Sequence, residues 1–242
     1  MSDGLETYSP VLNRDLEDVR VRDLGDLEGL NDLPMEQALE RISQAMAAAA
    51  SQATLGIMLG GEHTCSLGGF RGLKRVHPQA VILQVDAHLD MRPSYDGQPF
   101  THATWLNHVA HEFGFVAVHQ VGLRSGDRHE WDLARRETAW SSTELSLPVA
   151  VREQIGRAPV YVSIDIDVLD PAHAPGTGCP EPGGVTFREL AAFLYALEGL
   201  RVVAVDVMEV SPNLEASNIT AAAAAKLVRE AILLFGSQPS SR

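Results

Sequence analysis

Three ionisable residues follow one apolar run of this sequence at alternate positions. The run, residues 81–85, reads VILQV, and it leads into DAHLD, which contains Asp86, His88 and Asp90. Burying a charged group without a partner costs several kcal/mol or more. Carboxylates and imidazoles that share one buried face therefore need compensating charges, which divalent metal ions can supply.

Similar groups follow most of the other strongly apolar runs. Because ligands bind at the carboxyl ends of the strands in an open parallel sheet, we expect these groups to converge on one edge. Four aspartates within a few ångströms could not all stay ionised without cations among them. The further residues are His63 in GGEHT, Asp165 and Asp167 in VSIDID, and Asp206 and Glu209 in VDVMEV.

Oxygen-rich ligation with some imidazole favours Mn²⁺, with Mg²⁺, Fe²⁺, Co²⁺ and Zn²⁺ as alternatives. There are more carboxylates than one ion needs, whereas two ions about 3.5–4 Å apart would use them all and could hold a hydroxide between them. Each motif has a purely structural alternative when taken alone. DAHLD could be a hydrogen-bonded loop, Asp165 and Asp167 could cap a strand end, and Asp170 before Pro171 is typical of a turn.

The elements that must position these residues alternate between strand and helix, which predicts an α/β layer fold with a mostly parallel sheet. One helix is expected from Pro34, one after the Thr186/Glu189 capping box and before Gly199, and one between residues 217–220 and Gly236. We expect a single domain over residues 1–242, with residues 1–18 irregular. Strands are expected at residues 54–59, 81–85, 116–121, 160–164 and 202–207, and a weaker edge strand at residues 19–24.

The composition excludes several classes of function. The chain has 242 residues, 45% of them hydrophobic, and a formal net charge of −13. This charge argues against nucleic-acid partners, which need a basic surface, and against anionic membrane surfaces. The sequence shows no secretory signal, no apolar run long enough to span a membrane, and two cysteines, too few for a disulfide framework. We therefore expect a cytoplasmic protein.

Four stretches, GGEHT, DAHLD, SIDIDVLDPAHAPGTGCPEPGG and DVMEVSP, resemble the signatures of the ureohydrolases, the arginases, agmatinases and related hydrolases of guanidino compounds. The closest resemblance is to agmatinases, which hydrolyse agmatine to putrescine and urea. The resemblance implies an arginase-like three-layer αβα fold, shortened at the N-terminus, and a homo-oligomer, a trimer or hexamer. It also implies two Mn²⁺ ions per chain and a small cationic guanidino substrate.

The resemblance also implies roles for individual residues. His63, Asp86, Asp90 and Asp165 would hold one ion, and Asp86, His88, Asp165 and Asp167 would hold the other. A hydroxide bridging the ions would attack the guanidinium carbon, and Asp90 would orient it and pass its proton to the leaving amine. Glu209 would pair with the guanidinium, which matches the forked donors of a planar cation. His102 in THATW would shuttle protons, and Thr177 in PGTGCP would donate a hydrogen bond near the substrate.

Other functions stay open at this point. The substrate could be another guanidino or formimino compound, such as arginine, guanidinobutyrate, guanidinopropionate or formiminoglutamate. The loop at residues 91–102 lacks recognisable arginase-type residues that grip an α-amino acid, which favours a substrate without an α-carboxylate. The chain could also be a truncated, non-catalytic member of the family. A single-zinc deacetylase is disfavoured by the additional ligands His63, Asp90 and Asp167.

Overall fold

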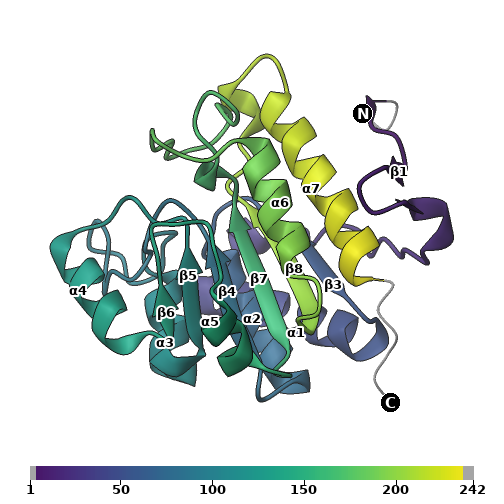
Figure 1. Ribbon diagram of the computed structural model, residues 1–242. Coiled ribbons are helices and arrows are strands. Elements are labelled where there is room, and N and C mark those ends of the chain that lie inside the picture. Colours follow the sequence, from purple (N-terminus) through teal and green to yellow (C-terminus); the bar gives the residue numbers. More distant parts are fainter. Residues whose placement is uncertain (1–3, 237–242) are drawn as a thin grey trace.

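The computed structural model describes residues 4–236 and is built around a six-stranded sheet (Figure 1). Every pairing in this sheet is parallel, in the order β3-β8-β7-β4-β5-β6. The predicted α/β fold with a parallel sheet is therefore confirmed. The strands are β3 (Gly56–Leu59), β4 (Val81–Val85), β5 (Val118–Val121), β6 (Trp140–Ser141), β7 (Val160–Asp165) and β8 (Val202–Met208).

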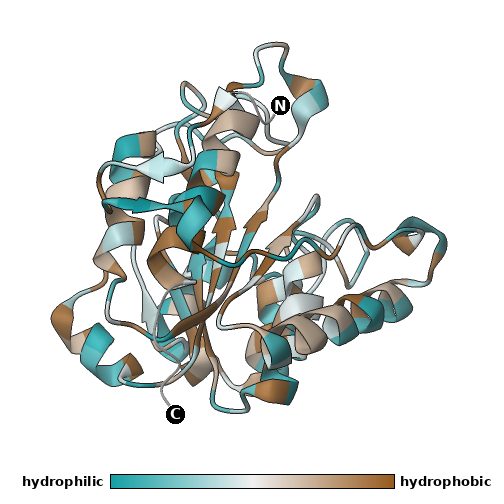
Figure 2. Ribbon diagram, turned by 90° about the vertical axis from the view of Figure 1, so that its right-hand side faces the viewer, coloured by the Kyte–Doolittle hydropathy of each residue, from teal (hydrophilic) through white to brown (hydrophobic). Residues whose placement is uncertain are grey.

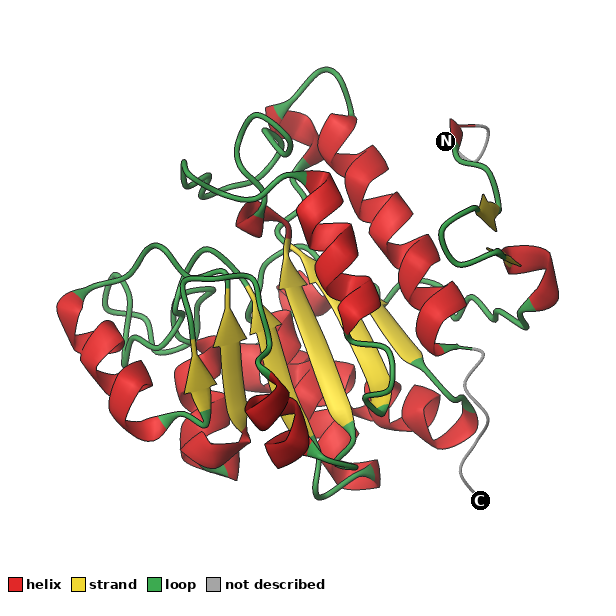
Figure 3. Cartoon of the chain, viewed as in Figure 1, coloured by secondary structure: helices red, strands yellow, loops and turns green. Residues whose placement is uncertain are grey.

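Helices cover both faces of the sheet and complete the three layers (Figure 3). One apolar cluster joins the sheet to the first four helices, and a second joins it to the last three. The first group is α1 (Met35–Gln52), α2 (Cys65–Val76), α3 (Trp105–Phe113) and α4 (Arg128–Glu137). The second is α5 (Val149–Ile155), α6 (Phe187–Ala196) and α7 (Ile219–Phe235).

The helix ends follow their local signals closely. Thr186 and Glu189 form the predicted capping box at the start of α6, and each side chain accepts a hydrogen bond from the other residue's backbone N–H. Asn218 is the N-cap of α7 and Gly236 is its C-cap. The Thr186 capping box and the Gly236 N–H, which donates to the Ile232 carbonyl, satisfy backbone groups that a helix end leaves without partners, whereas Asn218 makes no side-chain capping bond.

Hydrophobic residues are concentrated in the central strands of the sheet. Figure 2 shows the central strands coloured mostly as hydrophobic, and every residue of β7 and β8 is buried. Several polar residues inside the strands, among them Gln84, Gln120, Ser163 and Asp206, are fully buried. Among the described residues, no helix combines the length and the apolar character that crossing a membrane requires.

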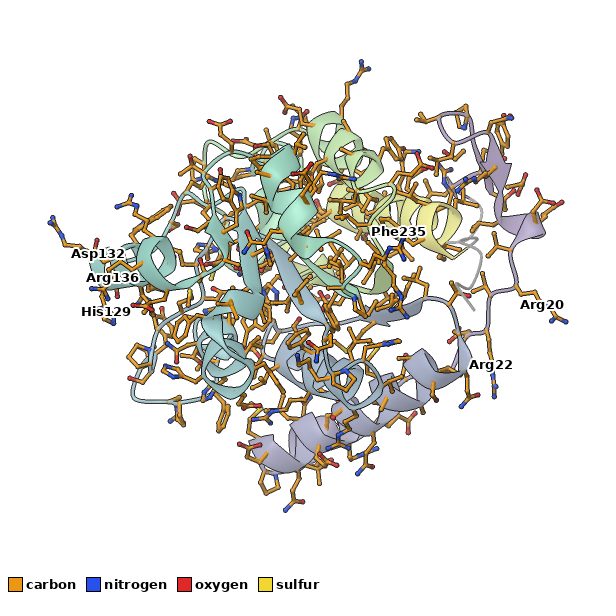
Figure 4. All side chains as sticks on the ribbon, turned by 60° about the horizontal axis from the view of Figure 1, so that its bottom comes forward. Arg20, Arg22, His129, Asp132, Arg136 and Phe235 are labelled. Atoms are coloured by element: carbon orange, nitrogen blue, oxygen red, sulfur yellow. The ribbon has the colours of Figure 1, made fainter. Side chains whose placement is uncertain are left out.

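The prediction of an edge strand at residues 19–24 is wrong. This segment is extended but unpaired, and within the described part of the chain no backbone hydrogen bond joins it to β3. Arg20 and Arg22 project away from the body of the protein (Figure 4). The alternation of apolar and polar residues satisfies the strand pattern, but a strand also needs a partner edge within hydrogen-bonding reach. As a result β3 is the outer strand of the sheet on this side.

Residues 4–18, which were expected to be irregular, contain a short hairpin. Its strands are β1 (Tyr8–Ser9) and β2 (Arg14–Asp15). The Ser9 hydroxyl donates to the Glu230 carboxylate at 2.7 Å, and the Arg14 guanidinium donates to the Leu233 carbonyl at 2.8 Å. These two bonds attach the hairpin to α7. Residues 1–3 lie outside the described residues, and the single-domain assignment stays a prediction.

Helices α1 and α2 pack closely because α2 presents glycines to α1. A Cβ at Gly68 would lie 2.9 Å from the Leu39 carbonyl oxygen. A Cβ at Gly72 would overlap the Ser43 carbonyl oxygen and lie 2.9 Å from the Met46 Cβ. Since α2 begins two residues after His63, this packing also sets where that histidine lies.

We expect Gly72→Ala to lower the free energy of unfolding by about 1–3 kcal/mol, because the added methyl has no space and overpacked cores are strained. Urea unfolding followed by circular dichroism measures the change. The control is Gly4→Ala, where the added methyl meets nothing within 4 Å. A Gly72→Ala protein as stable as the wild type would contradict the close approach of the two helices.

Candidate metal centre

The carboxyl ends of neighbouring strands bring the predicted metal ligands together. Asp86 follows β4 directly and Asp165 ends β7, and these strands pair so that Val85 lies opposite Ile164. The loop after β3, on the far side of β8, contributes His63. The fold therefore confirms the expected convergence at one edge of the sheet for these residues.

The first group of side chains surrounds one nitrogen of His63. Its Nδ1 lies 3.0 Å from an Asp165 oxygen, 3.3 Å from an Asp86 oxygen and 3.4 Å from an Asp90 oxygen. All four residues are buried. One ring nitrogen that faces three carboxylates can bind one proton at most, so most of the negative charge in this group needs another cation.

The second group shares Asp86 with the first. His88 Nδ1 lies 2.9 Å from Asp167 Oδ2 and 3.7 Å from Asp86 Oδ1, whereas Asp86 Oδ2 faces His63. Ligand atoms of His63, Asp86 and Asp90 lie within 4.8 Å of one another, and so do those of Asp86, His88 and Asp167. Two adjacent sets of oxygen and imidazole donors with a shared carboxylate fit a pair of divalent ions.

The electrostatics of the metal-free side chains reflect this crowding. Burial raises the pKa of Asp90 well above its usual range, and the Asp86 carboxylate raises it further. Burial also raises the pKa of Asp165, with Asp167 and Asp86 adding to the effect. Burial opposes protonation of His88, but the adjacent Asp167 and Asp86 carboxylates outweigh it and raise its pKa to about 12. Without a metal ion, the cluster therefore retains protons.

Asp90 is held in a conformation that few non-glycine residues adopt. Its φ is +54°, in the left-handed region, which costs on the order of 1 kcal/mol and is found most often at functional sites. The Trp105 indole N–H donates to Asp90 Oδ2 at 2.7 Å, and the backbone N–H of the next residue, Met91, donates to the buried Glu130 carboxylate at 3.0 Å. These bonds fix the carboxylate beside His63.

A chain of two buried amides supports the same carboxylates, and sequence reasoning missed it. Gln120 Nε2 donates to Gln84 Oε1 at 2.7 Å, and Gln84 Nε2 donates to Asp86 Oδ2 at 2.7 Å. Gln84 Nε2 also lies 3.3 Å from Asp90 Oδ2. The available signal was a polar residue inside each apolar strand, VILQV and VHQV.

Glu209 lies next to the cluster, and one of its carboxylate oxygens accepts no hydrogen bond from residues 4–236. Its Oε1 accepts the His63 backbone N–H at 2.8 Å, and its own N–H donates to the Gly61 carbonyl at 2.8 Å. Its φ is +63°, a second left-handed residue at this site. A Cβ at Gly178 would lie 3.6 Å from Oε2, so the glycine leaves space beside that oxygen.

The other two predicted site residues lie at the edge of the cluster. His102 Nδ1 lies 3.7 Å from a Glu62 oxygen, and this carboxylate, with the nearby Glu209 charge, raises the His102 pKa despite burial. The Thr177 hydroxyl is buried and has no hydrogen-bond partner within residues 4–236. Thr177 forms a β-bridge with Val210, directly after Glu209.

Two further aspartates, Asp170 and Asp206, lie outside the cluster. Asp170 accepts backbone N–H groups of Ala172, Gly183 and Gly184, which confirms its interpretation as a turn residue. Asp206, expected at the same edge, lies inside β8, where three hydroxyl groups donate to it. The reason is its position: β8 continues to Met208, so Asp206 is two residues short of the strand end.

Comparison with known proteins agrees with this geometry. The model of the arginase family matches residues 1–234. An agmatinase from Bacillus anthracis is 38% identical over 96% of this chain and 81% of its own length, and a guanidinobutyrase from Pseudomonas aeruginosa is 31% identical over 90% and 72%. A crystal structure from Clostridium difficile superposes with a TM-score of 0.90 at 32% identity, covering 97% of this chain and 86% of that one. This chain belongs to the arginase family.

Proposed function

We propose that the chain hydrolyses a linear guanidino compound. The preferred candidate is agmatine, which would give putrescine and urea. Water adds its oxygen to the guanidinium carbon, the bond from that carbon to the chain nitrogen breaks, and the released amine takes up a proton. The observation that carries the proposal is the sharing of Asp86 by two ligand groups, with Glu209 beside them.

We assign the metal ligands as the sequence resemblance implies, with Mn²⁺ as the metal. His63, Asp86, Asp90 and Asp165 would hold one ion, and Asp86, His88, Asp165 and Asp167 would hold the other. The distances from His63 Nδ1 support the first set, and the adjacent donor atoms of Asp86, His88 and Asp167 support the second. The share of Asp165 in the second ion rests on the sequence resemblance. When bound, the two ions lower the pKa of water, so that a nucleophile is available near neutral pH.

The remaining residues bind the substrate and move protons. The Glu209 oxygen that accepts no bond from the described residues pairs with the guanidinium, as a carboxylate does with forked N–H donors. Asp90 orients the attacking water and passes its proton toward the leaving nitrogen. His102, held by Glu62, shuttles protons with solvent. The buried Thr177 hydroxyl donates a hydrogen bond near the substrate.

A cationic substrate fits the charge of the chain better than an anionic one. The net charge is −13, and the partly exposed Glu62 and Glu209 carboxylates flank the cluster, which would disfavour a guanidino acid. This favours agmatine, which carries a second ammonium group, over guanidinobutyrate, which carries a carboxylate. The cytoplasmic location and the trimeric or hexameric assembly stay predictions.

The direct test uses protein that has been stripped of metal and reloaded with Mn²⁺. Urea release is measured with agmatine, arginine, guanidinobutyrate and guanidinopropionate. The proposal expects the highest kcat/KM for agmatine. Preference for guanidinobutyrate would move the assignment to that substrate, and no urea from any of the four would contradict the proposal and favour a non-catalytic member of the family.

Replacing Glu209 by glutamine should separate substrate binding from metal binding. Glutamine keeps an acceptor for the His63 N–H but loses the charge that pairs with the guanidinium, which is worth about 1.5–3 kcal/mol. We expect kcat/KM for agmatine to fall about 10- to 100-fold, with Mn²⁺ content unchanged. The exposed Glu198→Gln is the matched control and should keep wild-type kinetics. A kcat/KM equal to that of the wild type in Glu209→Gln would contradict the proposed role of this carboxylate in binding the substrate.

Replacing Asp86 or Asp165 by alanine should remove both ions, because each carboxylate is assigned to both. Metal analysis after Mn²⁺ loading should then find well under one ion per chain, and urea release should fall at least about 1,000-fold. Asp170→Ala, which alters only a turn, should keep two ions and nearly full activity. Equal losses in all three variants would indicate folding damage instead.

Mn²⁺ affinity should rise with pH, because protons and metal ions compete for the same side chains. The His88 pKa of about 12 means that its imidazole is protonated at neutral pH, and the raised pKa values of Asp90 and Asp165 favour their neutral forms; protons bound to these groups must leave when a metal ion binds. Each proton released strengthens binding about tenfold per pH unit. Calorimetry between about pH 6.5 and about pH 8, in two buffers of different ionisation enthalpy, measures both affinity and proton release. Binding that is independent of pH and buffer would contradict the assignment.

A further inference from the structure

A buried polar network lies beneath the cluster, and the proposed reaction does not use it. Its centre is Asp206, which is 0% exposed in the middle of β8. Three hydroxyl groups donate to its carboxylate, each at 2.7 Å: Ser163 to Oδ1, and Ser66 and Tyr161 to Oδ2. Burial raises the pKa of Asp206, but the three hydroxyl donors oppose this effect and match the acceptor-only character of the ionised carboxylate.

The strand register explains why these residues meet. Ser163 of β7 lies directly opposite Asp206 of β8, and Tyr161 is two residues earlier on the same face of β7. Ser66 comes from the first turn of α2. The network therefore joins the two central strands to the helix that follows His63.

Ser163 also contacts His63. Its Oγ lies 2.9 Å from His63 Nε2. A hydroxyl has one hydrogen, and the Asp206 carboxylate at 2.7 Å is a better acceptor than the Ser66 hydroxyl at 3.4 Å. The Ser163 hydrogen is therefore directed to Asp206, and the lone pair of Ser163 accepts a hydrogen bond from Nε2–H of His63.

We infer that Asp206 and Ser163 are positioning residues, which fix His63 as the tautomer with hydrogen on Nε2 and a free lone pair on Nδ1. The inference rests on the proposed metal centre, since Nδ1 is the nitrogen that faces Asp86, Asp90 and Asp165. The Trp105 ring stacks on His63 at 4.5 Å and holds the plane of the imidazole, but stacking does not select which nitrogen carries the proton.

The other tautomer would place an N–H where a metal ligand is needed. A histidine that binds metal through one nitrogen generally donates the other N–H to a fixed acceptor, and loss of that acceptor typically costs about 10- to 100-fold in metal affinity. In this chain the acceptor is a serine hydroxyl that a buried carboxylate holds in the accepting orientation.

The test compares three variants, each of which lacks one of the hydroxyl groups that donate to Asp206. Ser163→Ala removes the acceptor of His63, whereas Ser66→Ala and Tyr161→Phe leave it in place. Calorimetric titration of the metal-stripped full chain with Mn²⁺ should show one of the two ions bound about 10- to 100-fold more weakly in Ser163→Ala. The two controls should stay within about threefold of the wild type, since neither group contacts His63. Thermal unfolding of each metal-free variant checks that it is folded.

A second measurement reads the tautomer directly. In protein with ¹⁵N-labelled histidine, loaded with diamagnetic Zn²⁺ and assigned with His63→Asn, two-bond ¹H–¹⁵N spectra should place the His63 proton on Nε2. A proton on Nδ1 would overturn the inference. So would wild-type Mn²⁺ affinity in Ser163→Ala, or an equal loss of affinity in Ser66→Ala and Tyr161→Phe.

These measurements use no substrate, so they fail separately from the proposed function. If the wild type released no urea and Ser163→Ala alone bound Mn²⁺ weakly, the positioning role would be supported and the proposed hydrolase function would be refuted. If the wild type hydrolysed agmatine and Ser163→Ala bound Mn²⁺ normally, the proposed hydrolase function would be supported and the positioning role would be refuted.

Discussion

Three carboxylates converge on one imidazole nitrogen in the interior of this protein. Asp86, Asp90 and Asp165 all lie within 3.4 Å of His63 Nδ1, and Asp86 is shared with a second group that contains His88 and Asp167. Like charges at these separations are tolerated only if protons or metal ions compensate them. This electrostatic constraint explains why so many surrounding groups are ordered hydrogen-bond donors.

The surrounding structure holds the carboxylates together against their repulsion. Parallel strands fix the backbone of Asp86 and Asp165, Trp105 and Gln84 donate to the carboxylates, and the left-handed backbone of Asp90 turns its side chain inward. Supports of this kind keep metal ligands in place before the metal binds. The fold thus supplies a preorganised set of oxygen and nitrogen donors instead of relying on the ion to collect them.

The sequence predicted those parts of the structure whose signals are local. The strands at residues 81–85 and 160–164, the Thr186 capping box and the convergence of ligands at strand ends all depend on short-range patterns. The helices α2 to α5 and the short strands β1, β2 and β6 were not predicted; each of these strands has two residues, too few to show a pattern. The segment at residues 19–24 has a local strand pattern, but a distant partner decides pairing.

The supporting residues were missed for a related reason. Ser163 lies 100 residues from His63 and 43 residues from Asp206 in the sequence, so their contacts follow from strand order alone. A polar residue inside an otherwise apolar strand, as in VYVSID and VVAVDV, was the available signal. Without strand order, such a residue indicates that a buried partner exists but does not identify it.

Anomalous diffraction from crystals grown with Mn²⁺ tests the central claim most directly. Two peaks about 3.5–4 Å apart are predicted, with Asp86 between them and His63 and His88 on opposite sides. A manganese-saturated crystal with no peak among these side chains, and with the carboxylates turned away from one another, would contradict the metal centre and the function built on it.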